Sequence, residues 1–124
     1  MKIQRTKYGR GVFAAKDYKA GDVIEESQII ALSESDSRKI DDTLLYDYYF
    51  SWGEKDNQAA IALGNGSLFN HSYSPNAQYT KNIDQGLITF SAIKPIQKGQ
   101  EILVNYNGDP SSENPLWFNA DTEY

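Results

Sequence analysis

Short runs rich in Val, Ile, Tyr, Phe and Thr recur along the chain and are separated by Gly, Pro, Asn, Asp and Ser. Runs of this length, bounded by turn-forming residues, are typical of β-strands. Similar turns, at residues 19–22 and 97–100, each precede an apolar run. The pattern predicts strands over residues 11–14, 22–32, 59–63, 77–80, 87–92 and 101–106.

Residues 41–52 permit two interpretations. Their apolar spacing suits a short amphipathic helix, whereas the density of aromatic side chains favours a strand. No other segment has the pattern of a long helix. We therefore expect a mostly β fold of short sheets with little helix, and an irregular tail from residue 107 onward.

The composition excludes several kinds of active site and metal site. The chain has 124 residues, which is the usual size of one domain, with no cysteine and one histidine. Disulfides, thiolate metal sites and cysteine nucleophiles are thereby excluded, and we expect no metal site. No apolar run reaches the roughly 20 residues that span a bilayer, and the first ten residues include four Lys or Arg with no apolar stretch behind them. We expect an intracellular protein, in cytoplasm or nucleus, without membrane contact.

Charge is distributed unevenly along the sequence. Residues 1–19 hold six Lys or Arg against one acid, whereas residues 21–60 hold ten acids against three bases. A cleft lined by the acidic segment would concentrate a cationic partner, and the same surface would repel nucleic acid. A solvated acidic face with no partner is the alternative interpretation.

Three motifs occur in order along the chain. The first is Gly-Arg-Gly-Val-Phe-Ala at residues 9–14, and the second is Phe-Asn-His-Ser-Tyr-Ser-Pro-Asn-Ala at residues 69–77. The third, Gly-Gln-Glu-Ile followed by a tyrosine, covers residues 99–106. Each alone is weak evidence for a function. Together, at these separations, they resemble the SET-domain family of protein-lysine methyltransferases, most closely its very small stand-alone members of viral or bacterial type.

This resemblance covers residues 4–107 and implies a fold and a reaction. The fold is a β-clip of short sheets in which the carboxyl-terminal segment forms a pseudoknot. The SET domain would comprise residues 1–107, and residues 108–124 would close the site without a cysteine-rich zinc module. The reaction is methyl transfer from S-adenosylmethionine to a lysine side chain, leaving S-adenosylhomocysteine. The expected partner is a basic protein, such as a histone in chromatin, and a homodimer is one way to complete the peptide groove.

The resemblance also assigns residues to the cofactor. The backbone around Gly9, Arg10 and Gly11 is expected to hold its methionine part. The side chain of Asn70 and the backbone of His71 would contact it as well. Trp117 is expected to cover the adenine, with Phe118 as the alternative.

On the lysine side, Tyr106 matches the family tyrosine whose hydroxyl lies where the methyl donor and the lysine nitrogen meet. Tyr48 matches a catalytic aromatic residue of the lysine channel, with Tyr46 and Tyr49 as alternative registers. The remaining residues expected to bind substrate are Tyr49, Leu68 and Val104.

The sequence departs from the family pattern at three positions. Arg10 replaces an aromatic residue that many members place between the first two glycines, and Asn105 stands where Asp or Ser is frequent. Val104 is smaller than the Phe or Tyr often found there. Because a small side chain leaves room, we expect products beyond monomethyl-lysine. Two alternatives remain: a catalytically silent module that binds peptide or cofactor, and a β-clip domain unrelated to methyl transfer.

Overall fold

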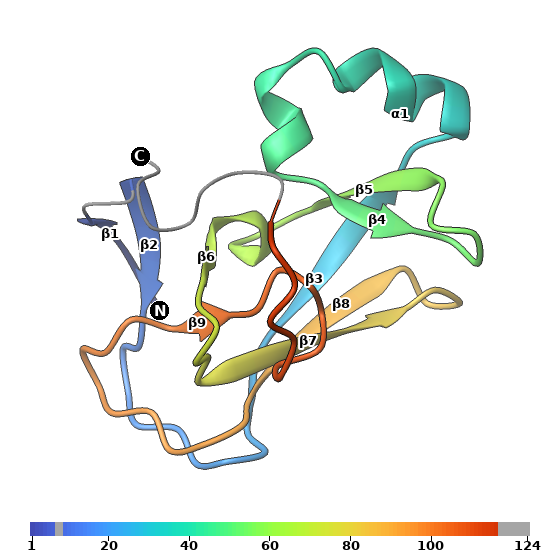
Figure 1. The fold of residues 1–124 in the computed structure, drawn as a ribbon. Coiled ribbons are helices and arrows are strands. Elements are labelled where there is room, and N and C mark those ends of the chain that lie inside the picture. Colours follow the sequence, from blue (N-terminus) through green and yellow to red (C-terminus); the bar gives the residue numbers. More distant parts are fainter. Residues whose placement is uncertain (7–8, 117–124) are drawn as a thin grey trace.

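The computed structural model describes residues 1–6 and 9–116, in which short strands dominate (Figure 1). One α-helix and two single-turn 3-10 helices, η1 and η2, interrupt the strands of this described part. In chain order the elements are β1 (Lys2–Thr6), β2 (Gly9–Phe13), β3 (Val23–Ala31), α1 (Glu34–Ile40), η1 (Leu44–Asp47), β4 (Phe50–Trp52), β5 (Gln58–Ala62), η2 (Gly66–Leu68), β6 (Asn70–His71), β7 (Ala77–Asn82), β8 (Leu87–Ala92) and β9 (Leu103–Val104).

Within the described residues the strands form three small sheets. The largest has the order β4-β5-β3-β8-β7 and is antiparallel throughout. Strands β1 and β2 form an antiparallel pair, and β6 pairs with β9 in parallel. The predicted fold class, mostly β with little helix, is confirmed.

The core lies where these sheets meet. Its largest fully buried side chains are Phe69, Phe90, Ile88, Ile96, Ile102, Val12 and Val104. Phe69 precedes β6 and stacks on Phe90 of β8, with ring centroids 4.4 Å apart. Burying an apolar side chain of this size contributes roughly 1.5–3 kcal/mol. The core therefore fixes β6, and with it the second sequence motif, against the main sheet.

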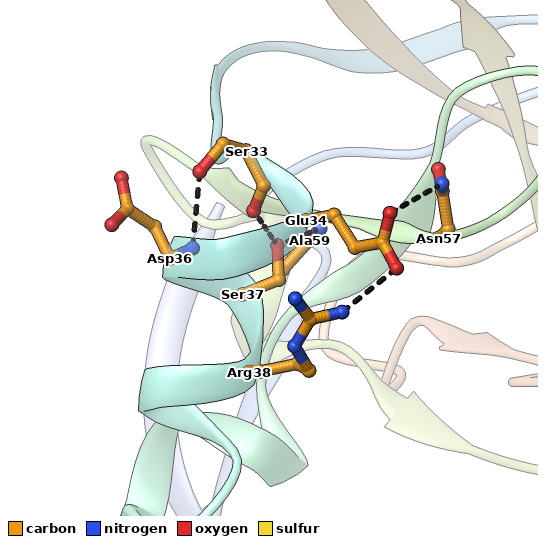
Figure 2. Close-up of polar contacts among 7 residues, drawn as sticks. All are labelled: Ser33, Glu34, Asp36, Ser37, Arg38, Asn57 and Ala59. Carbon is orange, nitrogen blue, oxygen red and sulfur yellow. Dashed lines mark hydrogen bonds and ion pairs between the residues drawn. The ribbon is translucent and has the colours of Figure 1, made fainter.

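Helix α1 is attached to β5 through the hydroxyl of Ser37 (Figure 2). Ser33 caps the helix, because its side chain accepts the N–H of Asp36 at 3.0 Å. The hydroxyl of Ser37 donates to the carbonyl of Ser33 at 2.7 Å and accepts the N–H of Ala59 at 2.8 Å. Figure 1 shows α1 beside β4 and β5, at that side of the five-stranded sheet. This attachment positions residues 41–52, which follow the helix.

The two interpretations of residues 41–52 each fit part of the segment. Its first half contains η1, capped by the hydroxyl of Thr43, and its end forms β4. The sequence pattern missed β1, β6 and the seven-residue α1. The last strand, β9, is shorter than the strand predicted over residues 101–106, because a turn begins directly after Asn105.

The chain after β9 is held against the segment that follows β6. The hydroxyl of Tyr73 donates to the carbonyl of Asn114 at 2.9 Å, and the side-chain amide of Asn107 donates to the same carbonyl at 2.9 Å. Trp117 and Phe118, the residues expected over the adenine, lie outside the described residues. Across residues 1–6 and 9–116, no helix has the length and apolar character needed to cross a membrane.

Candidate active site

The parallel pairing of β6 with β9 brings the second and third motifs together. Asn70 lies opposite Leu103, and His71 lies opposite Val104. Asn76 braces the junction, because its side chain donates to the carbonyl of Glu101 at 2.9 Å and accepts the N–H of Leu103 at 2.8 Å. The asparagine at the end of the second motif therefore sets the register of the third.

The first motif reaches the same junction through Asn70. Its side-chain amide donates to the carbonyl of Arg10 at 3.0 Å and to the Glu101 carboxylate at 2.8 Å. Gly9 adopts a φ of 100°, which favours glycine. A Cβ at Gly11 would collide with the Glu101 carboxylate and lie 3.0 Å from the Asn70 amide nitrogen. All three motifs thus converge, and they pack so closely at Gly11 that a side chain larger than hydrogen does not fit there.

His71 connects this junction to Tyr106. Its Nδ1 accepts the backbone N–H of Tyr106 at 2.9 Å, which requires that Nδ1 carry no proton. Burial lowers the pKa of His71 and so favours the neutral imidazole. The proton of the neutral ring then lies on Nε2, which is buried and has no hydrogen-bond partner among the described residues. The His71 ring packs nearly perpendicular to the ring of Tyr73, with centroids 4.4 Å apart.

Beside the junction lies a cavity of about 200 Å³ with an aromatic wall. Tyr106 forms part of this wall, and its hydroxyl donates to the carbonyl of Phe69 at 2.7 Å. The lining residues come from the segment around η1 and β4, from η2 and β7, and from β9 and the residue pair after it. They are Tyr46, Asp47, Tyr48, Tyr49, Phe50, Ser51, Gly66, Ser67, Phe69, Tyr79, Lys81, Val104 and Tyr106.

The phenols whose pKa values change in this wall stay neutral near pH 7. The hydroxyl of Tyr79 donates to the carbonyl of Tyr106 at 3.0 Å, and burial raises the pKa of Tyr79 to about 12. The hydroxyl of Tyr49 donates to the Asp41 carboxylate at 2.8 Å, and burial together with that carboxylate raises its pKa to about 12. At Tyr49 and Tyr79 the cavity therefore presents neutral hydroxyl groups instead of phenolate charge.

The structure groups the predicted residues in two sets. Tyr48, Tyr49, Val104 and Tyr106 line the aromatic cavity, as does the alternative Tyr46. Gly9, Arg10, Gly11, Asn70 and His71 belong to the junction of the three motifs. Leu68 is not among the described lining residues, although Ser67 and Phe69 on either side of it are. The roles assigned to these residues stay predictions.

The motif pattern did not reveal several residues of this region. Tyr79 and Lys81 line the cavity from β7, where their spacing of two residues places them on the same face. Glu101 was visible in the third motif, but its hydrogen bond to Asn70 was not predicted. The alternation of side chains along residues 77–82 shows which residues share a face of the strand, but the sequence does not show which other segments that face contacts.

Comparison with known proteins identifies the family to which this fold belongs. The family model described as the SET domain matches residues 9–107. The chain belongs to the SET-domain family. The predicted family membership is therefore confirmed.

Individual relatives agree with this family. The chain is 32% identical over 111 residues to a histone-lysine N-methyltransferase of Schizosaccharomyces pombe, specific for lysine 37 of histone H3. That alignment covers 89% of this chain and 70% of the relative. Among solved structures, a Plasmodium falciparum protein provisionally named a histone methyltransferase is 28% identical, with a TM-score of 0.65. The match covers 85% of this chain and 90% of that one.

A more distant structure shares the fold alone. Chaetomium thermophilum Polycomb Repressive Complex 2, in an autoinhibited conformation bound to S-adenosylmethionine, contains a chain 21% identical to this one, with a TM-score of 0.70. The match covers 84% of this chain but 14% of that one.

Proposed function

We propose that this chain transfers methyl groups from S-adenosylmethionine to the side-chain amine of lysine in a basic protein, such as a histone tail. Its place of action would then be the compartment that holds this substrate. The observation that carries the proposal is the position of Tyr106. Its backbone is bonded to His71 at the junction of the three motifs, while its side chain lines the aromatic cavity. One tyrosine thus joins the proposed cofactor side to the proposed lysine side.

The residues at the junction fit the cofactor. Gly9 adopts a φ of 100° and Arg10 beside it is exposed, and the buried Nε2 of His71 has no acceptor among the described residues. Exposed backbone beside glycines is suited to close approach by a ligand. We therefore assign Gly9, Arg10, Gly11, Asn70 and His71 to S-adenosylmethionine, which when bound supplies an electrophilic methyl group on a positively charged sulfur.

The cavity suits the other reactant, a lysine side chain. Lysine has a pKa of about 10.4, so its neutral, nucleophilic form costs about 4.6 kcal/mol at pH 7. A wall of tyrosine rings excludes water and disfavours the ammonium form. The hydroxyl of Tyr106 donates to the Phe69 carbonyl, which orients its oxygen lone pairs. We propose that Tyr106 positions the amine nitrogen, and that Tyr48 and Tyr49 align the lysine stem.

Charge around the cavity favours a basic substrate. Residues 34–56, which include α1, η1 and β4, contain seven acids and three bases. Within this segment Arg38 pairs with Glu34 at 2.8 Å and Lys39 pairs with Asp36 at 3.6 Å, so two of the bases already face acids. Asp47 lines the cavity itself. The remaining negative potential would attract the Lys- and Arg-rich sequences that flank a target lysine.

Methyl-transfer and binding assays on paired variants test this function. We expect radiolabelled methyl transfer to core histones by the wild type, a loss of at least 100-fold in Tyr106→Phe, and retained activity in Tyr18→Phe. Tyr18 is a matched control because it is a buried tyrosine that does not line the cavity. Calorimetric titration should show S-adenosylmethionine binding by all three proteins. Binding without transfer by the wild type would instead indicate a silent binding module, and no binding would indicate an unrelated β-clip domain.

Val104 adds a prediction about the product. This buried side chain lines the cavity and is smaller than an aromatic ring. We expect mass spectrometry of the product peptide to show di- or trimethyl-lysine. Because Val104 is in the core, Val104→Leu is a milder enlargement than Val104→Phe, and we expect it to shift the products toward monomethyl-lysine. Strict monomethylation by the wild type would contradict this assignment.

A further inference from the structure

The cavity proposed to admit a lysine already contains one in its wall. Lys81 lies on the same face of β7 as Tyr79 and is half-buried. Its Nζ donates to the hydroxyl of Ser51 on β4 at 3.1 Å. Among the residues that the structure describes, no carboxylate lies within ion-pairing distance of this ammonium group. A lysine that only anchored the surface would extend its charge into water or onto an acid.

The electrostatic surroundings of Lys81 are mixed. Burial lowers its pKa, and the charge of Asp56 opposes that shift. Asp47 is a second acid facing the cavity, and the neutral phenols of Tyr49 and Tyr79 complete the neighbourhood together with Tyr46, Tyr48 and Tyr106. The side chain of Lys81 therefore presents a positive charge to an aromatic space from which water is partly excluded.

We propose that Lys81 lowers the pKa of the target lysine as it enters the cavity, and so increases the fraction of neutral amine available for methylation. The inference rests on the proposed function. Two ammonium groups in one poorly hydrated cavity repel each other, which lowers the pKa of both. The charge of Asp56 and the hydroxyl of Ser51 stabilise the charged form of Lys81, so the incoming amine is the group that loses its proton. The target ammonium releases this proton to water, and the nitrogen lone pair then forms the new C–N bond as the C–S bond breaks. The leaving sulfur keeps the electron pair and becomes neutral.

The expected size of the effect follows from Coulomb's law. A unit charge about 10 Å away, in an effective dielectric of about 20, changes a pKa by about one unit. Removing the charge of Lys81 should therefore move the acidic limb of the kcat profile upward by about one pH unit. At pH 7 the rate should fall about tenfold, because the neutral fraction of the amine falls by that factor. The KM for the peptide should stay unchanged or fall, since the incoming ammonium is no longer repelled.

The experiment compares steady-state methylation of a histone H3 peptide from pH 6.5 to pH 10. Lys81→Met removes the charge, Lys81→Gln removes it but keeps a donor for Ser51, and Lys81→Arg keeps the charge. Lys94→Met is the matched control, because Lys94 is exposed and does not line the cavity. We expect the two neutral variants to lose about tenfold at pH 7 and to recover at pH 9–10, while Lys81→Arg and Lys94→Met keep the wild-type profile.

Several results would overturn the inference. A wild-type profile in Lys81→Gln would show that the charge has no effect on the target amine. A loss of activity that is equal at every pH would show a structural role for Lys81. If Lys81→Met fails to fold, the Lys81→Gln and Lys81→Arg profiles still decide between these outcomes. Absence of transfer by the wild type overturns the proposed function itself, whereas transfer with an unaltered profile overturns only the role of Lys81.

Discussion

The bond between His71 and the backbone of Tyr106 provides the sharpest test of the site geometry. Nδ1 of His71 accepts this N–H at 2.9 Å, so the bond exists only while Nδ1 is unprotonated. Replacing His71 by Phe keeps an aromatic ring beside Tyr73 but removes the acceptor. Leaving a partly buried donor without its acceptor costs about 1–3 kcal/mol. We expect His71→Phe to lower the free energy of unfolding at pH 7.5 by that amount.

The pH dependence of this difference can be worked out from the pKa. Burial lowers the pKa of His71 in the folded chain below its ordinary value of 6.5. The unfolded chain therefore binds a proton at higher pH than the folded chain does. As the pH falls from about 6.5 toward the folded-state pKa, the free energy of unfolding of the wild type decreases. His71→Phe lacks this contribution, so the stability difference between the two proteins should narrow in acid.

Because the chain has one histidine, its imidazole can be observed without assignment ambiguity. Nuclear magnetic resonance of ¹⁵N-histidine-labelled protein should show the neutral ring with its proton on Nε2 and a pKa below 6.5. Urea denaturation of wild type and His71→Phe between pH 5 and 8 measures the stability difference. A proton on Nδ1, a pKa above 6.5, or a difference that widens in acid would each refute the assigned bond.

Two further predictions concern the attachment of α1 and the glycine beside Asn70. Ser37→Ala should lower the free energy of unfolding by about 1–3 kcal/mol, because the buried N–H of Ala59 loses its acceptor. Ser35→Ala, on the exposed face of the same helix, should change it by no more than about 0.5 kcal/mol. Equal effects of the two substitutions in urea denaturation would contradict the role of Ser37. Gly11→Ala should weaken S-adenosylmethionine binding about tenfold or more in calorimetric titration, because the added methyl group collides with Glu101. An unchanged affinity would show that the cofactor does not bind beside Gly11.

The sequence named residues on both sides of the site, and four of them, Tyr48, Tyr49, Val104 and Tyr106, line the cavity. Asn70, His71 and Tyr106 were identified from the order and separation of three motifs, which can be read from the sequence without knowledge of the packing. Most strands also follow from local composition, because β3, β5, β7 and β8 are bounded by turn residues. The two-residue β6 carries no such pattern, since its pairing depends on β9, which begins more than thirty residues later.

The residues that the sequence did not reveal depend on contacts between distant segments. Ser33 and Asp36 have the spacing of a helix cap, so α1 was within reach of local pattern analysis. In contrast, Ser37 acts through its hydrogen bond to the N–H of Ala59, 22 positions away, and Lys81 is positioned by its hydrogen bond to Ser51. Local pattern gives the face on which such a side chain lies, whereas its function depends on what the fold places opposite.

The charges around the proposed lysine channel differ in their exposure to solvent. The acidic segment around α1 and η1 is exposed, so its attraction for a basic peptide acts over roughly 10 Å and weakens as salt is added. Lys81 is half-buried in the cavity wall, where screening is weaker and its repulsion reaches only a side chain that has entered. Capture and deprotonation would therefore respond differently to ionic strength. Added salt should raise the KM for the peptide while leaving the acidic limb of the pH profile of kcat nearly unchanged. If salt shifted this limb as strongly as it raised KM, the charge of Lys81 would have to lie in solvent.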